Sequence, residues 1–112
     1  MRLVLAAVLT LIPLTAQPPQ HPEPKNLKLL KADEVRGAMG AFRAALGVQC
    51  TACHVKGDFA SDENPKKEMA RKMIVMTRDI NAKFPDGKQH VTCYTCHRGA
   101  TEPATAPAAG GQ

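Results

Sequence analysis

Apolar residues recur at helical spacing in two segments of this 112-residue chain. In ADEVRGAMGAFRAALG, residues 32–47, they follow one another at steps of four, three and four, which makes one stripe of an amphipathic helix. The members of this stripe are Val35, Met39, Phe42 and Leu46. Asp33 is a suitable cap for the start of this helix and Gly47 for its end.

The second helical segment is NPKKEMARKMIVMTRDINAKFPDG, residues 64–87. Its stripe is longer and consists of Met69, Met73, Met76, Ile80 and Phe84. Asn64 is the predicted N-cap, Pro65 the first helical residue, and Pro85 the residue that stops the helix. No stretch alternates with a period of two, so the expected fold class is mostly α with no sheet.

Residues 1–16 have the pattern of a signal peptide, with a basic start at Arg2, an apolar run and a small residue, Ala16, at the expected cleavage point. The apolar run is shorter than the roughly 20 residues that span a bilayer, although an uncleaved anchor is the alternative. We therefore expect a periplasmic or otherwise exported protein. Since no cysteine lies near the cleavage point, we expect no lipid anchor.

The rest of the chain divides by composition into three parts. Residues 17–26, QPPQHPEPKN, predict an extended proline-rich leader, and residues 101–112 a disordered tail rich in Pro, Ala and Gly. The domain between them, residues 27–100, has few large apolar side chains, since the whole chain has three Phe, one Tyr and no Trp. A small domain with so little core usually needs a disulfide, a metal or a cofactor to stabilise it.

All four cysteines belong to two copies of the pattern CxxCH, in VQCTACHVKG at 48–57 and VTCYTCHRGA at 91–100. This pattern is the attachment signature of c-type haem. Two thiols three positions apart on one helical turn can each bond a vinyl group of the porphyrin, and the adjacent histidine can bind the iron. The predicted sites are Cys50, Cys53 and His54 for one haem and Cys93, Cys96 and His97 for the other.

Other uses of paired cysteines explain the sequence less well. Neither two disulfides nor a four-thiolate zinc site requires a histidine after each pair, so we expect no zinc. A thioredoxin-like motif expects a strand and helix context that the sequence does not show. We therefore predict two covalently attached haem c groups with their iron, and a fold of two helix–turn–CxxCH repeats around them. The haems would also supply the core that the chain lacks.

The sixth ligand of each iron is a further question, because methionine on a helix can bind haem iron through its thioether. Met39 is the one candidate methionine before the first motif. For the second haem Met76 and Met73 are close rivals on spacing, with Met69 on the same face. His90 is another candidate, although a loop position beside a haem propionate explains it better. Methionine is also ordinary core filling on many helices.

These units resemble the cytochrome c subunit bound to photosynthetic reaction centres. The resemblance rests on MGAFRAALGVQCTACH, on MIVMTRDINAKFP and on VTCYTCHRG, and it covers roughly residues 26–100. In that family each haem unit is a helix with an axial methionine, a turn and then CxxCH. The resemblance implies Met39 opposite His54 and Met76 opposite His97.

The resemblance also has limits. The family uses one histidine, in a loop comparable to that of His90, to bind a haem in the other half of the molecule. This chain has no second half, so such a role would require a second copy of the protein. The founding members carry four haems in two halves, whereas this chain has two motifs, and a free dihaem carrier is therefore the interpretation we prefer over one docked to a reaction centre.

The predicted function is electron transfer rather than catalysis. An iron with His and Met on its two faces has no open position for a substrate, so the chain would pass single electrons from a donor redox protein to an acceptor. A peroxidase-like dihaem enzyme with one open iron, or a permanently docked subunit of a membrane redox complex, are the alternatives. The formal charge of +5 is too weak to predict nucleic-acid binding. Lys67, Arg71 and Arg78 form either a face that steers an acidic partner or an ordinary solvated face.

Overall fold

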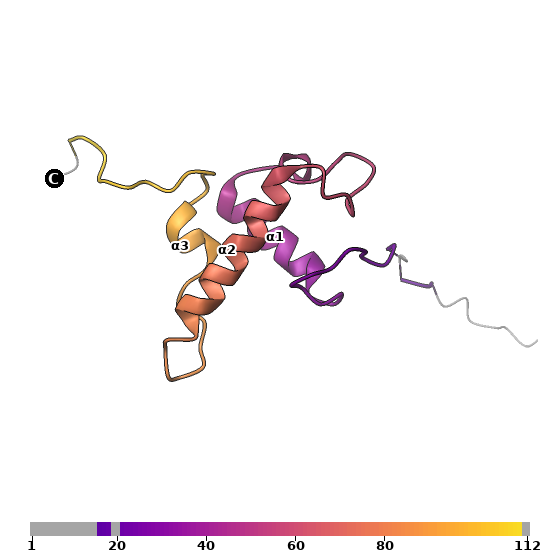
Figure 1. The fold of residues 1–112 in the computed structure, drawn as a ribbon, viewed down its shortest axis with the longest axis horizontal. Helices are drawn as coiled ribbons and strands as arrows, with labels where there is room; N and C mark the ends of the chain where they lie inside the picture. The colour runs from indigo at the N-terminus through magenta and orange to yellow at the C-terminus, as the bar shows by residue number, and fades with distance from the viewer. Residues whose placement is uncertain (1–15, 19–20, 111–112) are drawn as a thin grey trace, which may run out of the picture.

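The computed structural model describes residues 16–18 and 21–110, and it is mostly helical there. Helix α1 spans Val35–Leu46, the 3-10 helix η1 Cys50–Ala52, helix α2 Pro65–Asn81 and helix α3 Cys93–His97 (Figure 1). The described residues form no strand, and their one isolated bridge joins Val55 to Asp58. The expectation of a mostly α fold without a sheet is confirmed. Apart from Ala16, the predicted signal peptide lies outside the described residues.

Helix α1 begins one residue later than its sequence pattern suggested. Asp33 is not the cap: Glu34 occupies the N-cap position, with no hydrogen bond from its side chain to the helix. The carboxylate of Glu34 instead accepts from the backbone N–H of Lys31 at 3.1 Å, because residues 31–34 form a turn that leads into the helix. At the other end Gly47 caps as predicted, at φ 65° and with its N–H donated to the carbonyl of Arg43.

Helix α2 starts where the sequence predicted and ends earlier. Asn64 accepts the N–H of Lys66 through its side chain, and Pro65 is the first helical residue. The helix stops at Asn81, so Phe84 lies in the turns that follow and Pro85 is not the residue that ends the helix. The Asn81 side chain accepts the N–H groups of His90 and Val91 and donates to the carbonyl of Val91 at 2.7 Å. It thereby ties the end of α2 to the segment that returns to α3.

The basic residues of α2 that the sequence suggested for partner steering are all bound within the chain. Lys67 and Arg71 both contact the carboxylate of Asp62, and the side chain of each is 13% exposed. Arg78 donates to the carbonyl of Leu29 at 3.1 Å. These contacts hold the segment before α1 and the loop before α2 against the helix, and Asp62 partly neutralises Lys67 and Arg71.

A direct backbone contact joins the end of α1 to the residues just after α3. The N–H of Gly99, just after α3, donates to the carbonyl of Ala45 in the last turn of α1 at 2.8 Å. A Cβ at Gly47 would collide with the carbonyl oxygen of Gly99. Glycine at position 47 therefore serves two purposes: it adopts a left-handed conformation and it lets the two backbones meet.

The core is very small. Among the described residues Ala45 is the one buried apolar side chain, at 3% exposure. Several large apolar side chains are exposed instead, from Leu27 and Phe84 at 40% to Tyr94 at 58%. No helix in the described part of the chain is long and apolar enough to cross a membrane. Residues 101–110 run away from the helices without regular secondary structure (Figure 1).

The contact at Gly47 can be tested by substitution. Gly47→Ala introduces both an unfavourable φ and a collision with Gly99, so we expect it to lower the free energy of unfolding by about 1–3 kcal/mol or more. The measurement is chemical denaturation of the haem-loaded protein. Gly37→Ala is the control, because a Cβ there meets nothing within 4 Å and alanine is the better helix former. Equal free energies of unfolding in the two variants would contradict the close backbone contact between Gly47 and Gly99.

Candidate functional site

The first CxxCH motif lies on the turn that follows α1. Cys50 begins the 3-10 helix η1, and the N–H groups of Cys53 and His54 both donate to its carbonyl, at 3.2 and 3.0 Å. Side chains three positions apart eclipse one another on a 3-10 turn. The two thiols therefore lie on one side of a short turn, and the histidine follows at once.

The second motif lies wholly within α3. Thr92 caps this helix, and its side chain and that of Thr95 satisfy each other's backbone N–H groups in a capping box. Arg98 ends the helix at φ 50° and Gly99 continues at φ 88°, so the chain turns sharply after His97. Cys93 and Cys96 are neighbours on the helix surface at a separation of three. The two motifs thus share a sequence pattern but use different helical turns.

Both motif histidines are held in the same way. His54 Nδ1 lies 3.0 Å from the carbonyl oxygen of Phe59, and His97 Nδ1 lies 2.9 Å from that of Ala100. A carbonyl oxygen carries no proton, so each Nδ1 is the donor and the lone pair of the neutral imidazole lies on Nε2. Such a hydrogen bond from the second ring nitrogen is the usual companion of a metal-bound histidine. Sequence reasoning did not find these acceptors, because any residue type supplies a backbone carbonyl.

The four cysteines are free thiols in the structure, Cys50 and Cys96 exposed and the other two half-buried. Partial burial raises the pKa of the Cys93 thiol. Burial therefore favours the protonated form of this thiol over the nucleophilic thiolate. In the part of the chain described, no three His, Cys, Asp or Glu residues lie together as a metal-binding group.

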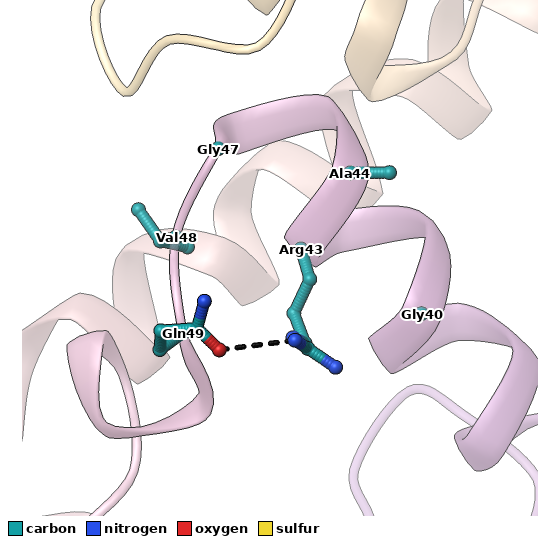
Figure 2. A pocket seen from close by; sticks show the side chains of 6 residues that line it. All are labelled: Gly40, Arg43, Ala44, Gly47, Val48 and Gln49. Carbon is teal, nitrogen blue, oxygen red and sulfur yellow. Dashed lines mark hydrogen bonds between the residues drawn. The ribbon is translucent and has the colours of Figure 1, made fainter.

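An open cavity adjoins each motif. The first has a volume of about 450 Å³ and lies along the last turns of α1 and the link to Cys50. Gly40, Ala44 and Gly47 give it a wall of small residues, and Arg43 reaches across to Gln49, with 3.0 Å between Nη2 and Oε1 (Figure 2). The second, about 630 Å³, is lined by residues between 95 and 106, including Cys96 and His97.

These features fit a large, planar, covalently held group such as haem. Each motif presents two thiols on one turn and an imidazole whose Nε2 is available, with an open cavity nearby. Several large apolar side chains, including Met76, Phe59 and Tyr94, are exposed. The chain therefore has both the attachment chemistry and the uncovered apolar surface that haem binding requires.

The candidate sixth ligands lie on the two longer helices. Met39 is half-buried in the middle of α1. On α2, Met73 is half-buried, while Met69 and Met76 are 53% and 44% exposed. The structure gives these side chains no partner that distinguishes one as a ligand.

His90 already has partners in the loop between α2 and α3. Its Nε2 lies 2.9 Å from both carboxylate oxygens of Asp86, and its ring stacks on Phe84 with 4.1 Å between centroids. The histidine holds the pKa of Asp86 below its usual value, with help from the backbone N–H of Lys88. His90 Nε2 is thus engaged within its own loop.

The chain is similar in sequence to known c-type cytochromes. The family model described as the photosynthetic reaction centre cytochrome C subunit matches residues 21–108. Cytochrome c-554 of Chloroflexus aurantiacus is 48% identical over 61 residues, which are 50% of this chain and 15% of that protein. The photosynthetic reaction center cytochrome c subunit of Rubrivivax gelatinosus is 34% identical over 90 residues, or 65% and 25% of the two chains.

A third relative matches the chain over a stretch of similar length. The photosynthetic reaction center cytochrome c subunit of Thermochromatium tepidum is 44% identical over 59 residues, which are 48% of this chain and 14% of that one. The chain spans a quarter or less of the length of these curated relatives. No solved structure matches it.

The small core leads to a prediction about the haem-free chain. We expect protein produced without haem attachment to be largely unfolded, because one buried alanine cannot offset the conformational entropy of ordering the chain. Far-UV circular dichroism and thermal melting of the haem-free and haem-loaded proteins measure this. A cooperative melt of the haem-free chain, with the helix content of the loaded protein, would show the prediction to be wrong.

Proposed function

This chain belongs to the photosynthetic reaction centre cytochrome c subunit family, and we propose that it is an exported dihaem cytochrome that passes single electrons between two redox partners. Cytochromes of this family carry covalently bound haem c and serve in electron transfer. The observation that carries the proposal is the pair of CxxCH turns, each with a histidine whose Nδ1 is fixed by a backbone carbonyl.

Each proposed site uses three residues of its motif. Cys50 and Cys53 would hold one haem through thioether bonds, and Cys93 and Cys96 the other. His54 and His97 would present Nε2 to the iron, since their Nδ1–H groups are already donated to carbonyls. The bound haem supplies an iron that changes between the ferric and ferrous states, while the protein fixes its ligands and its surroundings.

For the opposite face of each iron we propose Met39 at the first haem and Met76 at the second. The choice of Met76 is supported by the likeness of the run MTRDIN, residues 76–81, to the segment of this family that begins at the axial methionine. Met73, one turn earlier and half-buried, is the alternative. The pairing of His90 with Asp86 argues against His90, since a carboxylate already accepts its Nε2 proton. Methionine ligation raises the reduction potential of haem iron.

Iron with both axial positions filled is suited to electron transfer and not to substrate binding, which is why we favour a carrier over a peroxidase-like enzyme. Its partners would be a donor and an acceptor protein, one of which can be a membrane redox complex, as the names of the relatives suggest. We propose that residues 1–16 direct export and that residues 17–26 and 101–112 flank the dihaem domain, residues 27–100.

Methionine substitution tests the ligand assignment. In the haem-loaded protein we expect Met39→Ala and Met76→Ala each to lower the reduction potential of one haem and to let carbon monoxide bind rapidly to that haem alone. Spectroelectrochemical titration and carbon monoxide difference spectra measure the two effects. Met69→Ala, on the same helix as Met76, is the matched control and should change neither. Ligation by Met73 would appear as the same changes in Met73→Ala and not in Met76→Ala.

A further inference from the structure

We propose that Lys67 sets the reduction potential of the first haem site above that of the second, by acting on His54 through the backbone carbonyl of Phe59. Lys67 is then a positioning residue, since it touches neither the thiols nor the imidazole. This inference rests on the proposed function, because it takes His54 as an iron ligand. With the higher potential at the first haem, electrons within the chain would pass from the second haem to the first.

The ammonium group of Lys67 is held inside the loop that precedes α2. Its Nζ donates to three consecutive carbonyls, those of Phe59, Ala60 and Ser61, at 3.0, 2.9 and 2.8 Å. Its side chain is only 13% exposed. Lys67 therefore fixes the path of this loop and places a poorly solvated positive charge on its inner side.

One of these carbonyls also serves the first site. The oxygen of Phe59 accepts both the Lys67 ammonium and the Nδ1–H of His54, each at 3.0 Å. An acceptor shared with a cation has less electron density to offer its second donor, so the imidazole keeps its Nδ1 proton more fully and donates less charge through Nε2. A weaker ligand stabilises the ferric state less. The nearby positive charge also disfavours the more positive ferric state, so both effects raise the potential.

The second site has no matching cation. His97 donates to the carbonyl of Ala100 at 2.9 Å, and in residues 16–18 and 21–110 no side-chain donor other than this imidazole contacts that oxygen. The two histidines thus have the same kind of acceptor, but only that of His54 is polarised by an ammonium group. The expected result is a first haem that is reduced more easily than the second.

Asp62 offers a second way to change the charge around Lys67. Its carboxylate contacts Arg71 at 2.8 Å, Lys28 at 3.1 Å and Lys67 at 3.2 Å. The hydrogen bond from Arg71, with those from Asn26 and Lys28, holds the pKa of Asp62 far below its usual range, so it is ionised at neutral pH. Asp62 partly offsets the charge of Lys67, and its removal should have the opposite effect on the first haem.

The test is spectroelectrochemical titration of the haem-loaded protein and four variants. We expect Lys67→Met to raise the ratio of oxidised to reduced first haem at a fixed potential by about tenfold, equivalent to about 59 mV for a one-electron couple. Lys67→Arg keeps the positive charge, so the potential of the first haem should stay close to that of the wild type. Lys66→Met removes the same charge from an exposed neighbour and should have little effect. Asp62→Asn should move the first haem in the opposite direction.

The opposite signs separate a charge effect from simple loosening of the loop. Loosening would admit water and shift Lys67→Met and Asp62→Asn in the same direction, and this result would overturn the proposal. Equal shifts in Lys67→Met and Lys66→Met would overturn it as well. If Lys67→Met does not retain both haems, Asp62→Asn is compared with the wild type instead. An unchanged or lowered reduction potential of the first haem in Asp62→Asn then refutes the inference.

Haem content keeps this inference apart from the proposed function. The double variant Cys50→Ala with Cys53→Ala should retain one haem of two, which also identifies the potential of the second site. A haem content other than two in the wild type, or no loss in the double variant, contradicts the proposed function itself. Intact haem content with unmoved potentials contradicts the role of Lys67 alone.

Discussion

The hydrogen bond from each motif histidine to a backbone carbonyl is the constraint on which the rest of the site depends. It fixes the ring, and because a carbonyl can only accept, it also fixes the tautomer. The two acceptors, Phe59 and Ala100, lie at different distances along the chain from their histidines, so two differently shaped loops perform the same task. The sequence pattern CxxCH is therefore repeated more faithfully than the structure that surrounds it.

The second constraint is the shortage of core. Ala45 is the one buried apolar side chain in the described part of the chain, and polar contacts hold much of the rest. Lys67 and Arg71 bind the loop before α2, and Asn81 ties the far end of α2 to the segment before α3. Exposed ion pairs and surface hydrogen bonds contribute little to stability one by one. A covalently attached apolar group is therefore the expected source of most of the folding free energy.

The sequence predicted the elements better than their ends and their contacts. The spacing of apolar residues located both long helices, and local stereochemistry identified the caps Gly47 and Asn64 and the first residue of α2, Pro65. Asp33 was the wrong cap because Glu34 turns back to Lys31, and α2 ends early where Asn81 binds a segment nine and ten residues further on. The motif residues were evident from their types. The carbonyls that accept from the two motif histidines could not be predicted, because every residue has a backbone carbonyl and the sequence did not indicate how the loops fold.

The backbone contact between Ala45 and Gly99 also bears on how such a chain tolerates change over time. It joins the end of the first helix directly to the residues after the second motif, without passing through the 42 residues between Cys50 and Cys93. Residues inserted at the Asp86–Gly87 turn would lengthen a loop and leave this junction as it is. The relative placement of the two motifs is therefore insulated from the length of the chain between them.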